Sequence, residues 1–177
     1  LRSPLLSAYS FLRKSPPTWN ILNRVARSLY REHSFSLDTK QQRILHDLQQ
    51  NGIAFTHVDE LFPDQHILSD VTKEMERRKE DEKVGESKSF QRYALGSGST
   101  IDLESSFVQL SLHRRILDVV NSSMGMCAKL KYFELAVTNI LMRDGKVAMG
   151  SQRWHRDPGL KNLLKVFVYL SDVDETS

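Results

Sequence analysis

The sequence is poor in cysteine and has no long apolar run, and each shortage excludes a class of structure. Cys127 is the only cysteine, so the chain cannot form an internal disulfide. This suits a reducing compartment, and we expect Cys127 to be a small buried hydrophobic residue. No stretch approaches the ~18 consecutive apolar residues of a membrane-spanning helix. The 177 residues, 40% of them hydrophobic, are enough for one globular domain with a core.

Acidic residues are missing from the first 31 positions. This segment carries a charge of +6 and the whole chain carries +3, so the remainder carries −3. A pI near 9 invites a nucleic-acid interpretation. However, the basic residues are confined to one terminus and are not interleaved with aromatic residues, so we expect no nucleic-acid partner.

Residues 19–31 are predicted to form a basic amphipathic helix that Thr18 caps. Apolar residues at i, i+3, i+4 and i+7 share one side of this helix and arginines gather on another: Leu22, Val25, Ala26 and Leu29 against Arg24, Arg27 and Arg31. Three roles stay open: a surface helix docked on the same protein, a helix that docks on a membrane surface or a partner, or part of an organelle-targeting segment. Residues 1–35 are therefore set apart as a basic arm and helix. Without targeting, the expected location is cytoplasmic.

Periodicity predicts further helices over residues 38–50, 65–83 and 112–120, with Gly52 ending the first of them. Short strands are expected at 53–55 and within 131–142. Residues 85–100 are polar and rich in glycine and serine, which predicts a loop. That loop lacks the lysine-containing pattern of a phosphate-binding P-loop.

The strongest chemical signal is a histidine and an aspartate two residues apart. In a strand, His155 and Asp157 would leave the same face. Pro158-Gly159 predicts a turn directly after them, and residues 163–170 form an apolar run typical of a buried strand. One imidazole nitrogen and one carboxylate oxygen are two of the three ligands of a non-haem Fe(II) site. The third ligand is not visible, and an exposed turn with an Arg-Asp ion pair explains the same residues.

A protein-kinase motif overlaps this pair. His155-Arg156-Asp157 followed by Asn162 matches H-R-D-x-x-x-x-N, in which the aspartate accepts the substrate proton and the asparagine binds magnesium. The rest of the kinase pattern is missing, because no V-A-I-K strand precedes the motif and no D-F-G follows it. The metal-ligand interpretation is therefore favoured.

Two stretches together resemble the phytanoyl-CoA dioxygenase family of Fe(II)- and 2-oxoglutarate-dependent oxygenases. They are Trp-His-Arg-Asp-Pro at 154–158 and Leu-Lys-Val-Phe-Val-Tyr-Leu-Ser-Asp-Val-Asp at 164–174. The resemblance implies that residues 36–177 form an α+β domain, in which helices precede the strands of a double-stranded β-helix of jelly-roll, cupin-like type. It also implies Fe(II) bound by His155 and Asp157, 2-oxoglutarate contacted by Asn139 and Phe167, and ascorbate as a reductant.

The activity that the resemblance implies is hydroxylation of an unactivated C–H bond in a small-molecule or lipid-like substrate. Asp157 favours hydroxylation, since related halogenases have alanine or glycine at that position. In the family, the second histidine and the arginine that binds 2-oxoglutarate come from strands further along than Ser177. We therefore expect an incomplete jelly roll that is inactive when taken alone. The alternative is a catalytically inactive relative that serves as a binding or structural module.

Overall fold

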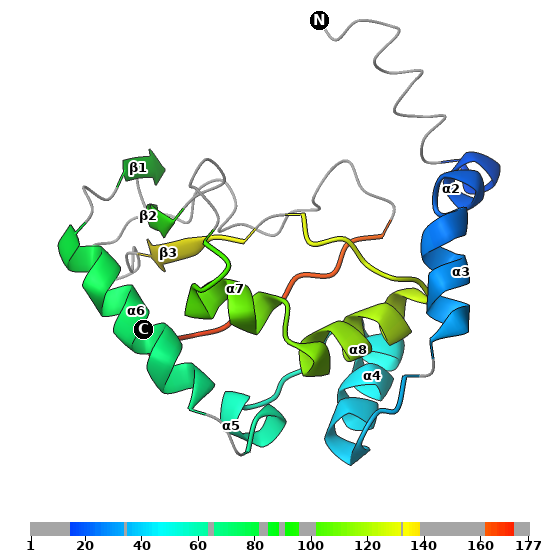
Figure 1. The fold of residues 1–177 in the computed structure, drawn as a ribbon, viewed down its shortest axis with the longest axis horizontal. Helices are drawn as coiled ribbons and strands as arrows, with labels where there is room; N and C mark the ends of the chain where they lie inside the picture. Colours follow the sequence, from blue (N-terminus) through cyan, green and yellow to red (C-terminus); the bar gives the residue numbers. More distant parts are fainter. Residues whose placement is uncertain are drawn as a thin grey trace, which may run out of the picture. The chain divides into compact units, whose positions relative to one another are not determined.

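The computed structural model describes residues 15–33, 35–63, 66–81, 85–88, 91–95, 102–131, 133–138 and 162–171. Helices dominate these ranges (Figure 1). The helices are α2 (Pro16–Leu22), α3 (Arg24–Glu32), α4 (Thr39–Asn51), α5 (Val58–Leu61), α6 (Ile67–Asp81), α7 (Ser106–Ser111) and α8 (Arg114–Met124). The strands are β1 (Gly85–Lys88), β2 (Gln91–Leu95) and β3 (Leu135–Thr138).

The chain divides into two compact units. The first comprises Leu1–Ala54, Asp118–Lys129 and His155–Val166, and the second comprises Phe55–Leu117, Leu130–Trp154 and Phe167–Ser177. Within the described ranges, no helix is both long enough and apolar enough to cross a bilayer.

In the first unit, the single helix predicted over residues 19–31 is two helices, α2 and α3, separated by a turn at Asn23. Proline suits the first turn of α2, where a backbone N–H has no partner within the helix. The Asn23 side-chain amide donates to the Trp19 carbonyl oxygen at 2.8 Å. Such a local bond competes with the regular helical pattern, which accounts for the interruption at this residue.

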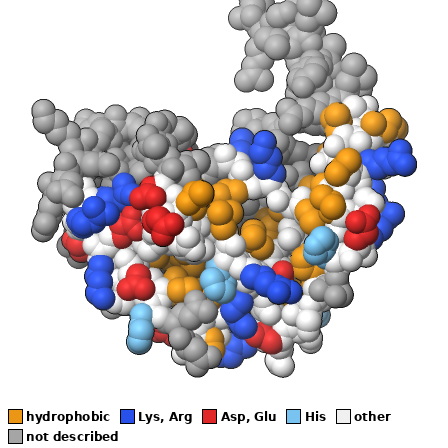
Figure 2. Space-filling view, in the orientation of Figure 1, with side chains coloured by type: hydrophobic (Ala, Val, Ile, Leu, Met, Phe, Trp, Pro, Cys, Tyr) orange, Lys and Arg blue, Asp and Glu red, His pale blue; other side chains and the backbone are white. Residues whose placement is uncertain are grey.

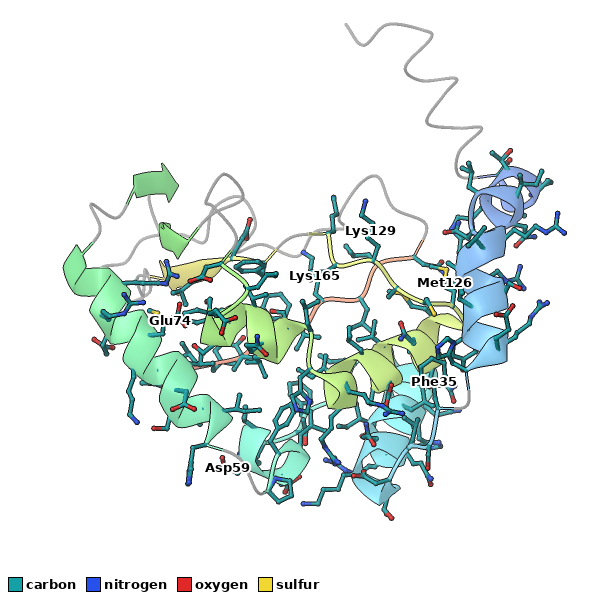
Figure 3. All side chains as sticks on the ribbon, viewed as in Figure 1. Phe35, Asp59, Glu74, Met126, Lys129 and Lys165 are labelled. Atoms are coloured by element: carbon teal, nitrogen blue, oxygen red, sulfur yellow. The ribbon has the colours of Figure 1, made fainter. Side chains whose placement is uncertain are left out.

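One side of α3 is held by the rest of the first unit. The Cys127 N–H donates to the Ala26 carbonyl oxygen at 3.0 Å, and Met126, labelled in Figure 3, lies beside this helix. At the end of α3, the ring of Tyr30 stacks on Phe35 with 4.9 Å between the ring centroids. No residue of α2 or α3 is buried in spite of these contacts. Cys127 itself is half-buried.

The boundaries of α4 follow the capping chemistry of the sequence. The Asp38 carboxylate accepts from the Gln41 N–H at 2.9 Å, and the Gln41 side chain accepts from the Asp38 N–H at 3.0 Å. This reciprocal pair is a capping box. Gly52 ends the helix at φ +73°, a left-handed conformation that glycine adopts without strain. The predicted helix and its stop are confirmed, with Ile44 on the buried side.

The core of the second unit is built around α6. The apolar stripe predicted for residues 65–83 is confirmed, because Val71 and Met75 are buried. The short helix α7, which the sequence analysis did not predict, lies against α6 and adds buried side chains of its own: Phe107, Val108 and Leu110. Leu61 of α5 and the adjacent Phe62 are buried as well.

The three strands form one small antiparallel sheet in the order β1-β2-β3. In the register, Gly85 is opposite Tyr93, and Arg92 is opposite Val137. The hairpin of β1 and β2 lies where a loop was expected, so that prediction is wrong. β3 lies within the predicted strand region, and its first residue, Leu135, is buried.

The predicted α+β jelly roll is wrong: the described part of the chain is mainly helical. Its strands are four or five residues long, and neither 53–57 nor 163–169 has regular secondary structure. An apolar run such as 163–170 becomes a buried strand only if a neighbouring strand satisfies its backbone and other elements cover its faces. None of the three described strands pairs with it. Three of its large side chains remain exposed: Val166, Phe167 and Tyr169.

Candidate functional site

Three of the four predicted site residues lie outside the described ranges. These are the metal ligands His155 and Asp157 and the 2-oxoglutarate contact Asn139. The fourth, Phe167, is described: its side chain is 72% exposed and it stands in a segment without regular secondary structure. Across the ranges that the structure describes, no group of three histidine, cysteine, aspartate or glutamate residues is placed to hold a metal ion.

The donor chemistry of the predicted pair fits two positions of an Fe(II) site. Imidazole nitrogen suits iron, and a carboxylate adds an anionic oxygen that balances part of the metal charge. Among the other histidines, His113 has one ring nitrogen in use, because its Nδ1 accepts from the Arg115 N–H at 3.1 Å. His33 Nδ1 lies 2.8 Å from the Leu29 carbonyl oxygen.

An ionisable group with several hydrogen-bond donors around it is Glu74, on the side of α6 that faces α7 (Figure 3). Its carboxylate accepts from the Ser106 N–H at 2.7 Å, from the Ser105 hydroxyl at 2.8 Å and from the Ser106 hydroxyl. Arg78, one turn further along α6, donates to Glu74 Oε1 from Nη2 at 2.9 Å and from Nε at 3.0 Å.

This carboxylate caps the start of α7 from another helix. Ser105, at the N-cap position, makes no side-chain capping bond within α7. The first N–H groups of a helix lack partners within it and attract negative charge, and Glu74 satisfies one of them at Ser106. The bond therefore fixes α7 to α6 and positions the buried face of α7.

The pKa of Glu74 reflects these contacts. Burial by itself would raise the pKa, but the hydrogen bonds from Ser106, Ser105 and Arg78 together outweigh burial and lower the pKa from 4.5 to about 2. The carboxylate is therefore ionised at neutral pH, and its oxygens are occupied by donors. These properties suit a structural anchor and do not suit an acid or base that exchanges a proton with a substrate.

The sequence analysis missed this cluster because its partners are far apart in the chain. Ser105 and Ser106 lie 31 and 32 positions after Glu74. Periodicity within α6 places Glu74 between Val71 and Met75, but it does not say which helix lies opposite. The only available signal was an acidic residue beside an apolar stripe.

The imidazole ring of His113 has a defined electrostatic environment. Its ring meets the Phe62 ring edge-on, with 4.7 Å between the centroids. Burial, and secondly the positive charge of Arg115, lower the pKa of His113 below its usual value of 6.5. Both effects favour the neutral imidazole, which agrees with a ring nitrogen that accepts from a backbone N–H.

An open cleft of about 250 Å³ lies along α2 and α3. Its lining is polar and strongly basic: Asn20, Arg24, Arg27, Ser28 and Arg31. Arg27 Nη1 donates to Asn20 Oδ1 at 2.9 Å, which ties the two helices across the turn at Asn23. A cleft lined by three arginines suits an anionic ligand.

No protein-family model, no curated protein and no solved structure matches this chain.

Proposed function

We propose that the protein is an Fe(II)- and 2-oxoglutarate-dependent dioxygenase related to phytanoyl-CoA dioxygenases, and that it hydroxylates an unactivated C–H bond of a small-molecule or lipid-like substrate. One observation carries the proposal. His155 and Asp157 stand two residues apart before Pro158-Gly159, and an apolar segment that resembles the family follows them. Two ligand types that iron accepts are thus combined in the spacing that can direct both to one ion.

Each residue has a defined role in the proposal. His155 contributes a neutral nitrogen and Asp157 an anionic oxygen, while Asn139 and Phe167 contact 2-oxoglutarate. The role of Phe167 rests on the resemblance, and its ring is exposed. When bound, Fe(II) together with 2-oxoglutarate and oxygen supplies the oxidising power for C–H hydroxylation. A ligating histidine must be deprotonated, so iron affinity falls in acid.

Metal binding is the primary test, because His155 and Asp157 are proposed as two of the three ligands. Fe(II) is titrated anaerobically into the 177-residue protein with 2-oxoglutarate, and binding is measured by calorimetry. His155→Ala and Asp157→Ala should each weaken Fe(II) binding at least tenfold, in line with the strong dependence of metal affinity on ligands and their supports. The matched controls His46→Ala and Asp59→Ala remove the same side-chain types from exposed positions and should leave binding unchanged.

Succinate formation from 2-oxoglutarate is the second measurement. Turnover that requires both His155 and Asp157 would support the enzyme and place a third ligand within these 177 residues. Fe(II) binding that is equal in the wild type and in both ligand variants would contradict the proposed site.

The alternative function is that of a catalytically inactive binding module. A specific observation favours this candidate, because α2 and α3 leave both apolar and basic side chains exposed next to each other. Absence of specific Fe(II) binding, together with binding of a partner through α2 and α3, would favour this second function.

A further inference from the structure

Exposed apolar side chains form a stripe over α2 and α3. Val25 and Leu29 are four residues apart in α3, so they lie on one side of it, and Ile21 stands at the end of α2 directly before the turn at Asn23. Ile21 is 74% exposed and Val25 is 71% exposed, while Leu29 and the neighbouring Leu22 are exposed as well. Figure 2 shows apolar and basic side chains next to one another over these two helices.

The arginines of the cleft border this stripe. Arg24, Arg27 and Arg31 follow at intervals of three and four, and so form a second row along α3. Within the described part of the chain, none of the three forms an ion pair. The nearby acid Glu32 instead accepts a hydrogen bond from the Ser28 hydroxyl at 3.0 Å.

The inward contacts of α3 explain why both rows face solvent. Ala26 and Tyr30 are the residues that meet the Cys127 N–H and the Phe35 ring. Ala26 and Tyr30 are four positions apart, so they define the attached side of α3. Val25 and Leu29 lie beside this attached side and stay exposed, while the arginine row lies on another side of α3.

We propose that α2 and α3 dock on a bilayer surface that contains anionic phospholipid. The three guanidinium groups bind lipid phosphates, for which their planar donors are well suited. The aliphatic side chains of the stripe enter the region just below the headgroups, as in other interfacial helices. Helices of seven and nine residues are too short to span the bilayer and lie along its surface.

Charge and composition favour a lipid surface over a second copy of the chain. In a two-fold symmetric dimer the same patch faces itself, which would bring the arginine row against its own equivalent. An anionic membrane instead neutralises the arginines and removes the aliphatic side chains from water in one step. The proposal does not depend on Fe(II) binding, because no residue of the metal pair takes part.

The test measures co-sedimentation of the full chain with phosphatidylcholine vesicles, with and without phosphatidylserine. Binding should require phosphatidylserine and should weaken as salt is added, because screening shortens the range of the attraction. Arg24→Gln together with Arg31→Gln should weaken binding roughly 25-fold, about fivefold for each charge near the surface. Lys40→Gln with Lys129→Gln removes the same charge from exposed positions outside α2 and α3, and should change binding less than about twofold.

A second pair of variants tests the apolar stripe. Ile21→Ser should weaken vesicle binding roughly tenfold, because an isoleucine no longer enters the bilayer. Ile53→Ser is the matched control, since Ile53 is 54% exposed in the same unit but outside the stripe, and it should leave binding unchanged. Both positions are exposed, so the unfolding midpoints should stay close to that of the wild type.

Three results would overturn the proposal. One is equal binding to vesicles with and without phosphatidylserine. Another is vesicle binding that neither the arginine pair nor Ile21→Ser reduces. The third is self-association in light scattering that Ile21→Ser abolishes in the absence of vesicles, which would assign the stripe to a second copy of the chain.

Discussion

Two helical regions of this molecule have similar apolar spacing and opposite burial. In α3, Val25 belongs to an apolar stripe and is 71% exposed, whereas in α6 the corresponding stripe contains Val71, which is 1% exposed. The spacing of apolar residues predicts that a helix has an apolar face, but it does not predict that the face is buried. Whether that face is covered depends on what the rest of the chain places opposite.

The side-chain hydrogen bonds differ between the regions in the same way. Glu74 of α6 bonds to residues 31 and 32 positions away, so its carboxylate joins two helices into a core. Arg27 of α3 bonds to Asn20, only seven positions away, and Glu32 bonds to Ser28 of the same helix. Local bonds of this kind support a helix without attaching it to the rest of the unit. The α6–α7 pair is therefore part of the packed core of its unit. The α2–α3 region instead leaves apolar and basic side chains exposed.

Replacing Glu74 and Glu32, each by glutamine, should give the largest difference in stability between the two regions. Glu74→Gln should lower the free energy of unfolding by about 3 kcal/mol, because Arg78 loses its counter-charge and the serine donors lose their strongest acceptor. Glu32→Gln should change it by less than about 0.5 kcal/mol, since Glu32 is exposed. Urea unfolding of both variants checks this, and similar losses at the two positions would remove the distinction.

Acid should weaken the α6–α7 region in a defined window. The pKa of Glu74 is about 2 in the folded state and 4.5 in the reference state, so the shift stabilises the fold fully above about pH 4.5. That contribution, on the order of 3 kcal/mol, is lost as pH falls from 4.5 toward 2. Unfolding midpoints measured across this window should fall less in Glu74→Gln than in the wild type. An equal fall in both would show that Glu74 is not responsible.

His113 adds a weaker dependence of stability on pH, at higher pH than that of Glu74. The pKa of His113 is lowered below 6.5 in the folded state. Its contribution to the free energy of unfolding is therefore complete above pH 6.5 and is lost as the pH falls through the lowered pKa. His113→Asn should flatten the stability profile just below pH 6.5 and leave the acid window of Glu74 in place. A profile unchanged by this substitution would show that His113 titrates alike in both states.

Replacing Arg78 and Arg27, each by glutamine, should give the smallest difference in stability between the two regions. Arg78→Gln removes a partner of Glu74 that is 17% exposed, and should cost about 1 to 2 kcal/mol. Arg27→Gln should cost less than about 0.5 kcal/mol, because it breaks one exposed local hydrogen bond. Thermal unfolding of both variants measures this difference, and a larger loss at Arg27 would mean that α3 is integral to the core.

Local signals in the sequence predicted much of the helical framework. Asp38, Gln41 and Gly52 set the limits of α4 through bonds and backbone geometry that belong to neighbouring residues. The apolar stripe of α6 could be predicted because it also depends on the spacing of nearby residues. The short helix α7 was missed because its stability comes from Glu74 and from packing on α6, which are contacts over long distances in the sequence.

The jelly-roll prediction failed for a related reason. The run at 163–170 has the composition of a strand, but composition does not supply a neighbouring strand. The candidate metal pair shows the same dependence on context: the spacing of His155 and Asp157 is a property of the sequence, while a third ligand must come from elsewhere in the fold. Phe167 is exposed rather than part of a packed sheet.

The most direct test of the central claim compares two identical substitutions, Val25→Ala and Val71→Ala. Val71→Ala should lower the free energy of unfolding by about 2 kcal/mol, because it leaves a cavity among the buried side chains around α6. Val25→Ala should change it by less than about 0.5 kcal/mol and should reduce binding to phosphatidylserine vesicles. A large loss of stability in Val25→Ala with no loss of vesicle binding would contradict the assignment of α2–α3 as an exposed membrane-docking surface.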